Sequence, residues 1–227
     1  MNRKMWATFI SGGALAACIA ASIGAVAASS ESPANASSTT VVRAAFDPQG
    51  RAILPVGYRQ WQHVGTRYKP DGLNILDGLP AKTPEILNAY VEPSAFAAFE
   101  KTGKWPDGAQ IVKEFSAVQV GEGCDEQTHV CTNKLGRGLY ESGYIGLGMM
   151  VKDAKRFPDS PGNWGYFSFG HKPMPYDPVA TVRTRAQCSQ CHENLASDTD
   201  YVISRAHIGL DDHSGLRLPT GSGSGTP

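Results

Sequence analysis

The sequence predicts a mainly β domain of the α+β class, built as an antiparallel sheet with a few short helices. Three stretches carry the β-branched and aromatic content of strands: residues 109–120, 138–152 and 164–169. Gly and Pro are plentiful, at 25 and 15 of 227 residues, which indicates many turns between short elements. The helix signals are brief, so we expect strand content to exceed helix content.

The N-terminus carries the pattern of a secretory signal. Arg3 and Lys4 precede a long apolar stretch, and the small residues Ala25–Ala27 follow it. Residues 1–28 are therefore predicted to be a signal peptide, which places the mature protein in the periplasm. An alternative is a lipoprotein, because the residues before Cys18 also resemble a lipoprotein cleavage box and would leave this cysteine lipidated.

Composition divides the remaining chain into three parts. Residues 29–40 and 218–227 are polar and of low complexity, as in a flexible linker and a disordered tail. The folded domain is expected over residues 41–217. The chain has 21 basic and 21 acidic residues with no clustered basic face, so we expect no nucleic-acid partner.

The helix signals fall in two places. Residues 93–101 fit a helix, because Pro93 suits its first turn and Gly103 ends it. The chain around Cys188 should also be helical, with a possible continuation over residues 194–207. Residues 121–136 are expected to form a long hairpin connection.

The helix expected at Cys188 carries the chemistry. Covalent haem attachment needs two thiols about one helical turn apart, with a histidine beside the second one to ligate iron. Cys188, Cys191 and His192 supply that Cys-X-X-Cys-His spacing. The sequence thus predicts one haem c, attached through both thiols and ligated by His192. The alternatives are a structural zinc site and a thioredoxin-like dithiol.

Two further cysteines remain in the domain, Cys124 and Cys131. They could complete a zinc site, but their separation is longer than that of a usual zinc knuckle. Because an exported chain meets an oxidising compartment, we expect a Cys124–Cys131 disulfide; the alternative is a pair of free buried thiols.

The sixth iron position is open to several interpretations. Electron-transfer haems usually fill it with Met or His, while catalytic and gas-binding haems leave it open. The available side chains are Met149, Met150, Met174, His171 and His207.

Lys113 stands out within the strand predicted over residues 109–120. Alternate residues of a strand share a face, so Lys113 lies with Ile111, Phe115 and Ala117. An amine on an apolar face can snorkel to the edge with its charge in water. The functional alternative is a desolvated amine with a depressed pKa, which is a nucleophile.

A series of motifs resembles the cytochrome P-460 family. They are spread in order over residues 46–210, with the haem motif closing the domain. The motifs are Tyr58-Arg59-Gln60-Trp61, His63-Val64-Gly65-Thr66, Tyr90-Val91-Glu92-Pro93, Lys101-Thr102-Gly103, Val112-Lys113-Glu114-Phe115, Tyr144-Ile145-Gly146-Leu147, Lys152-Asp153-Ala154-Lys155-Arg156-Phe157-Pro158, Pro161-Gly162-Asn163-Trp164 and Phe167-Ser168-Phe169.

This resemblance implies an antiparallel β fold, commonly dimeric, with one haem c. The family's namesakes crosslink a lysine to the porphyrin and oxidise hydroxylamine, and that lysine corresponds to Lys113. The resemblance therefore implies hydroxylamine oxidation at an open iron site, with electrons passed to a soluble cytochrome. Two positions differ from those members: Leu87 stands where they have arginine, and Asp177 is the nearest candidate for their distal carboxylate.

Two other functions remain open. Related β-type cytochromes c′ lack the crosslink and bind nitric oxide without turnover. A simple electron-transfer cytochrome, with a sixth ligand such as Met174, is the third possibility. The absorption spectrum separates these three.

Overall fold

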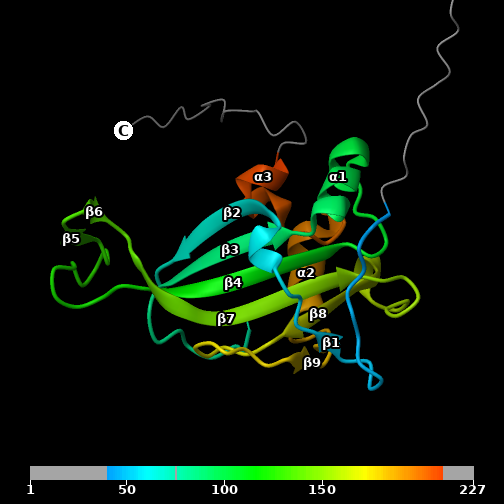
Figure 1. The fold of residues 1–227 in the computed structure, drawn as a ribbon, viewed down its shortest axis with the longest axis horizontal. Coiled ribbons are helices and arrows are strands. Elements are labelled where there is room, and N and C mark those ends of the chain that lie inside the picture. Colours follow the sequence, from blue (N-terminus) through cyan, green and yellow to red (C-terminus); the bar gives the residue numbers. More distant parts are fainter. Residues whose placement is uncertain (1–39, 75, 212–227) are drawn as a thin grey trace, which may run out of the picture. The chain divides into compact units, whose positions relative to one another are not determined.

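A five-stranded antiparallel sheet frames the domain, which a computed structural model describes over residues 40–74 and 76–211 (Figure 1). The predicted mainly β fold with short helices is confirmed. In spatial order the strands are β2 (Gln62–Lys69), β3 (Glu85–Val91), β4 (Gln110–Val118), β7 (Glu141–Lys152) and β8 (Trp164–Ser168). The predicted signal peptide, most of the linker and the tail lie outside the described residues.

Smaller elements surround this sheet. Two short antiparallel pairs are β1 (Ala52–Ile53) with β9 (Val179–Ala180), and β5 (Cys131–Asn133) with β6 (Gly136–Gly138). The α-helices are α1 (Pro93–Thr102), α2 (Ser189–Ala196) and α3 (Ile208–Asp211). The 3₁₀ turns within the described residues are η1 (Tyr58–Gln60), η2 (Pro161–Asn163), η3 (Ser197–Thr199) and η4 (Ser204–Ala206). Over residues 40–74 and 76–211, no helix has the length and apolar content to cross a bilayer.

Local sequence explains the ends of α1. The side chain of Glu92 accepts a hydrogen bond from the backbone N–H of Ala95 at 2.9 Å, which caps the N-terminus, and Pro93 occupies the first turn. At the other end Gly103 adopts φ 67°, a left-handed conformation that glycine reaches without strain. The predicted helix over residues 93–101 is confirmed.

The predicted continuation of the helix after Cys188 is wrong. Helix α2 ends at Ala196, and η3 and η4 follow in place of further α-helix. Asp200 and Tyr201 lie between them with φ of 52° and 63°, and two successive left-handed residues cannot continue a right-handed helix.

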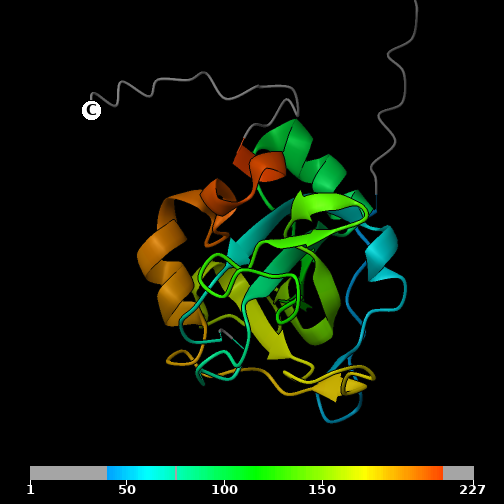
Figure 2. The same ribbon diagram turned by 90° about the vertical axis from the view of Figure 1, so that its left-hand side faces the viewer.

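Both faces of the sheet are buried. One face carries Val91, Ile111 and Trp164, and packs against α1, against Cys188 beside α2, and against the C-terminal segment. The other carries Val112 and Phe167, and packs against residues 44–61 and β9. Figure 2 shows α2 and the N-terminal segment on opposite sides of the sheet. We call the face that carries Val91, Ile111 and Trp164 the α2 face.

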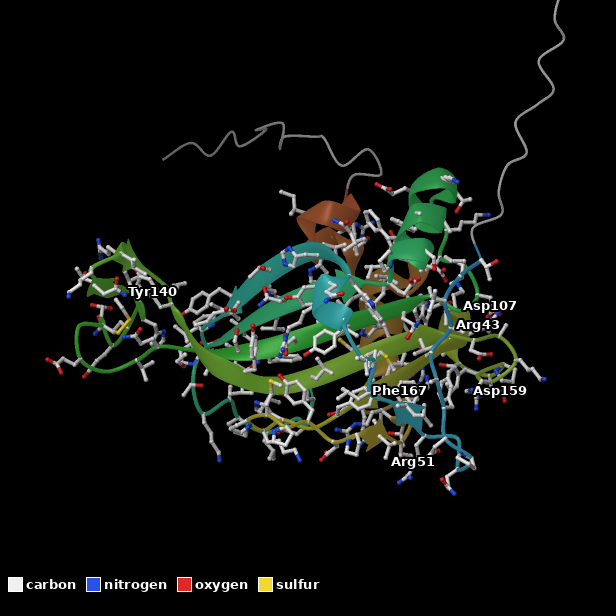
Figure 3. All side chains as sticks on the ribbon, viewed as in Figure 1. Arg43, Arg51, Asp107, Tyr140, Asp159 and Phe167 are labelled. Carbon is white, nitrogen blue, oxygen red and sulfur yellow. A yellow bond between two sulfur atoms is a disulfide. The ribbon has the colours of Figure 1, made fainter. Side chains whose placement is uncertain are left out.

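One ion pair fastens the start of the described chain. Arg43 contacts Asp107 at 2.6 Å, and the two side chains meet beside the loop that leads into β4 (Figure 3). This contact holds the N-terminal segment against the sheet at the surface.

The predicted disulfide is confirmed. Cys124 is bonded to Cys131, and this bridge closes the hairpin connection that contains β5 and β6. Figure 3 shows the bridge near Tyr140, beyond the end of the central sheet. Because the bridge uses both sulfurs, the zinc alternative loses the two further thiols that it required.

Candidate functional site

The two thiols of the haem motif stand at the start of α2. Cys188 is the residue that precedes the helix, and Cys191 is the third residue within it. Neither thiol takes part in a disulfide. Their spacing is therefore about one helical turn, which is the separation that the two vinyl groups of a haem require.

His192 is held in one orientation. Its Nδ1 lies 2.8 Å from the backbone carbonyl of Tyr201, which leaves Nε2 available, and its ring packs 4.6 Å from the ring of Tyr166. A hydrogen bond from one ring nitrogen to a carbonyl is the usual support of a histidine that ligates metal through the other. Burial lowers the pKa of His192, so the ring is neutral at pH 7, as an iron ligand must be.

The carbonyl that orients His192 is itself fixed. Asp200, just before Tyr201, forms an ion pair with Lys152. The indole of Trp164 donates to the Asp200 carbonyl at 2.8 Å. These contacts on β7 and β8 hold the left-handed turn at Asp200 and Tyr201 against the sheet, and so hold the imidazole.

Lys113 lies on the α2 face, flanked by small residues. In the sheet register it is opposite Ala89 on β3 and Gly148 on β7, and Gly148 is opposite Ser168 on β8. The neighbouring row, two residues along the strand, is apolar, with Ile111 between Val91 and Met150. Gly148 has no side chain, and Leu76 packs onto it so closely that a Cβ there would lie 2.8 Å from Leu76 Cδ2.

The pKa shifts on the α2 face link Lys113 to the residues of the haem motif. Burial, together with the nearby cationic Arg67, lowers the pKa of Lys113 to about 8, while Cys191 acts in the opposite direction. Lys113 in turn lowers the pKa of His192 and of His207. Lys113 on β4 therefore interacts electrostatically with both Cys191 and His192 of the haem motif.

Haem fits the residues that line this face. Tyr166 Oη and His207 Nδ1 are buried polar atoms with no hydrogen-bond partner among the described residues. The cationic Arg67 acts on the pKa of both Lys113 and His207, so its guanidinium is near enough to this face to bind an anionic group such as a haem carboxylate. Buried polar groups usually have partners, and a porphyrin placed here can supply them.

The candidates for the sixth iron position separate between the two faces. Met150, opposite Ile111, and the buried His207 belong to the α2 face. Met149 packs in the core of the other face, and Met174 contacts Arg59 there at 3.2 Å. His171 is engaged in hydrogen bonds with other side chains.

Asp177 and Leu87 occupy different surroundings. Asp177 is half exposed, pairs with Lys172 at 2.5 Å and lines a cavity of about 470 Å³. Leu87 is buried on the α2 face and packs with Leu76 and Phe115. Where the hydroxylamine-oxidising members carry an arginine, this chain therefore has an apolar cluster.

Two buried carboxylates escaped the sequence analysis. Glu114 lies on the opposite face from Lys113 and accepts hydrogen bonds from Tyr58, Arg59 and Tyr176. Glu85 begins β3 and is 1% exposed. The available signal was that each stands among apolar residues in a strand, but only the structure shows that both faces of that strand are buried.

Comparison with known families agrees with this geometry. The family model described as cytochrome P-460 matches residues 55–204, about two thirds of the chain. The matched range includes Lys113 and the whole Cys188–His192 motif. No curated protein sequence matches the chain.

Proposed function

Because this chain belongs to the cytochrome P-460 family and is therefore a haem cytochrome, we propose that it oxidises hydroxylamine at an open distal iron site. The reaction class is the removal of electrons and protons from a small nitrogenous ligand. The proposal includes a soluble cytochrome as electron acceptor, a periplasmic location and a homodimeric assembly.

Four residues carry the cofactor in this proposal. Cys188 and Cys191 attach one haem c by thioether bonds, and His192 supplies its nitrogen to the iron. When bound, the haem supplies the site that accepts electrons from the ligand. Lys113 would be the residue joined to the porphyrin edge, its nitrogen replacing a hydrogen there, and this link would change the redox properties of the haem.

The single observation that carries the proposal is the position of Lys113. Lys113 lies between Ala89 and Gly148 in the sheet register, burial lowers the pKa of its amine, and the amine influences the pKa of His192. Burying an ammonium is costly, and this lowers the pKa of Lys113 to about 8, so the neutral amine with its free lone pair is far more accessible at neutral pH than in an exposed lysine. A snorkelling lysine would instead place its charge in water.

The test measures hydroxylamine oxidation by the holoprotein under anaerobic conditions, with a soluble cytochrome c as electron acceptor. The wild type should reduce the acceptor, and Lys113→Ala should lose most turnover while keeping covalent haem through Cys188 and Cys191. Lys155→Ala is the matched control, because this lysine is exposed on the loop after β7. Equal turnover of wild type and Lys113→Ala would refute the role of the crosslink.

A second function has its own support. Leu76, Leu87 and Phe115 form an apolar cluster on the α2 face, and apolar surroundings suit an uncharged diatomic gas. The alternative is thus a protein that binds nitric oxide without turnover. A high-spin spectrum without the red shift, together with nitric oxide binding and no hydroxylamine oxidation, would favour it. A low-spin spectrum would indicate an electron carrier.

A further inference from the structure

Glu85 is an unusual residue on the α2 face. It is 1% exposed, and its Oε2 is buried without a hydrogen-bond partner among the described residues. Register places it on the same face as Lys113, because Glu85 is opposite Ala117 and Ala89 is opposite Lys113. Four residues of strand separate Glu85 from Ala89, which is about 13 Å.

The other oxygen of Glu85 begins a chain of side chains. Glu85 Oε1 lies 3.1 Å from His171 Nε2, and His171 Nδ1 lies 2.7 Å from Asp77 Oδ2. Asn74 donates to the same Glu85 Oε1 at 2.7 Å and holds it in place. An imidazole between two carboxylates can accept a proton at one nitrogen and release one from the other.

The chain of side chains ends in an open cavity. The exposed fraction of the side chains rises from 1% at Glu85 to 15% at His171 and 29% at Asp77. His171 and Asp77 line the cavity of about 470 Å³, together with Gln187, which directly precedes Cys188, and Ser168, which is opposite Gly148. The same cavity therefore borders the haem motif and the exposed end of the chain.

We propose that Glu85, His171 and Asp77 form a proton path from the α2 face to solvent. A proton released by a ligand on this face moves to Glu85 Oε2, directly or through a bridging water. Rotation of the protonated carboxyl group turns this proton toward His171 Nε2, which accepts it, and His171 releases its Nδ1 proton to Asp77. No electrons move in these steps. When Asp77 delivers the proton to water, Glu85 and Asp77 are carboxylates again and His171 carries its proton on Nε2, so rotation of the imidazole restores the starting tautomer before the next proton.

This inference rests on the proposed open haem site and adds to it the way in which protons leave. A simple structural explanation is that Asn74, Glu85, His171 and Asp77 fasten the loop before β3 to the sheet. That explanation leaves Glu85 Oε2 without a role, although an unpaired buried carboxylate oxygen costs stability. A role as acceptor of a transient proton explains why the protein keeps this carboxylate oxygen unpaired.

The test compares two ligands on the ferric holoprotein. Hydrogen cyanide must lose a proton to bind as cyanide, whereas nitric oxide carries none. Stopped-flow absorbance gives both association rates, and a pH-indicator dye in weak buffer reports proton release. Glu85→Gln should slow cyanide association about 100-fold, as expected for loss of a general base, and leave nitric oxide within about twofold. His171→Gln and Asp77→Asn should delay proton release at the dye.

Asp198→Asn is the matched control, since this aspartate is exposed and paired with Arg205 far from β3 in the sequence. Equal slowing of both ligands in Glu85→Gln would show a structural fastening and overturn the path. Unchanged cyanide rates would also overturn it, and slowing by Asp177→Asn in place of Asp77→Asn would overturn the assignment of the exit. If Glu85→Gln slows cyanide association and not nitric oxide association, but the wild type does not oxidise hydroxylamine, only the proposed function fails. If neither ligand binds the wild type, both fail.

Discussion

The buried carboxylate behind Lys113 gives an asymmetric stability prediction. Glu114 is 0% exposed, while its partner Arg59 is 39% exposed. Arg59 donates to it from Nε at 2.9 Å and from Nη2 at 2.6 Å, and the hydroxyl of Tyr176 donates at 3.0 Å. Replacing Arg59 by Met leaves the buried charge of Glu114 without its ionic partner. Replacing Glu114 by Gln leaves only the Arg59 guanidinium unpaired, and water can reach it.

The magnitudes follow from that difference in exposure. Arg59→Met should cost about 3 kcal/mol, the lower end of the range for removing one partner of a buried pair, because Arg59 is partly exposed. Glu114→Gln should cost about 2 kcal/mol, because the amide keeps part of the hydrogen bonding. Urea denaturation of the holoproteins measures both, and for a domain of this size each kcal/mol corresponds to about 2–4 °C in melting temperature.

The double variant decides the interpretation. If the pair is coupled, Arg59→Met combined with Glu114→Gln should cost less than the sum of the single changes. If Glu114→Gln is as damaging as Arg59→Met, or the costs add, the account of a buried charge held by one exposed arginine is wrong. Because Glu114 follows Lys113 directly, the same network fixes the orientation of Lys113 toward the α2 face.

Two more predictions concern the disulfide and pH. Changing Cys124 and Cys131 together to Ser should lower the free energy of unfolding by about 2.5 kcal/mol, because the bridge restricts the unfolded chain; urea denaturation measures this, and an unchanged midpoint would contradict it. Burial lowers the pKa of His207 to about 3 from about 6.5 unfolded. Its neutral form therefore stabilises the domain above pH 6.5, and about 4 kcal/mol is lost as pH falls toward 3. His207→Gln should flatten urea midpoints between pH 7 and 4, and an unchanged slope would contradict the assignment.

The sequence predicted the strands in which apolar and polar residues alternate or in which apolar residues are continuous. Strands β4, β7 and β8 and helix α1 match the predicted ranges within a few residues. Strands β2 and β3 were not predicted: Gly65 breaks the pattern of β2, where the register shifts between His63 and Gly65, and Asn88 interrupts β3. A bulge depends on the partner strand, so local propensity does not reveal it.

The sequence predicted only the part of the candidate site whose residues are close together along the chain. The Cys-X-X-Cys-His motif specifies its geometry because neighbouring residues on one helix must face one cofactor. Glu85 and His171 lie 86 residues apart and meet only through the fold of the loop before β3. The register that places Gly148 beside Lys113 likewise brings together strands separated by the hairpin. Such contacts follow from tertiary structure, which alternation within one strand does not specify.

The most direct test of the central claim is the absorption spectrum of the holoprotein, oxidised and reduced, for wild type and Lys113→Ala. Haem in both should resist extraction with acid-acetone, because the thioethers at Cys188 and Cys191 remain. The account predicts that the reduced wild type shows a Soret band shifted well to the red, and that Lys113→Ala shows an ordinary c-type spectrum. Coincident spectra would contradict the crosslink and leave nitric oxide binding as the better function.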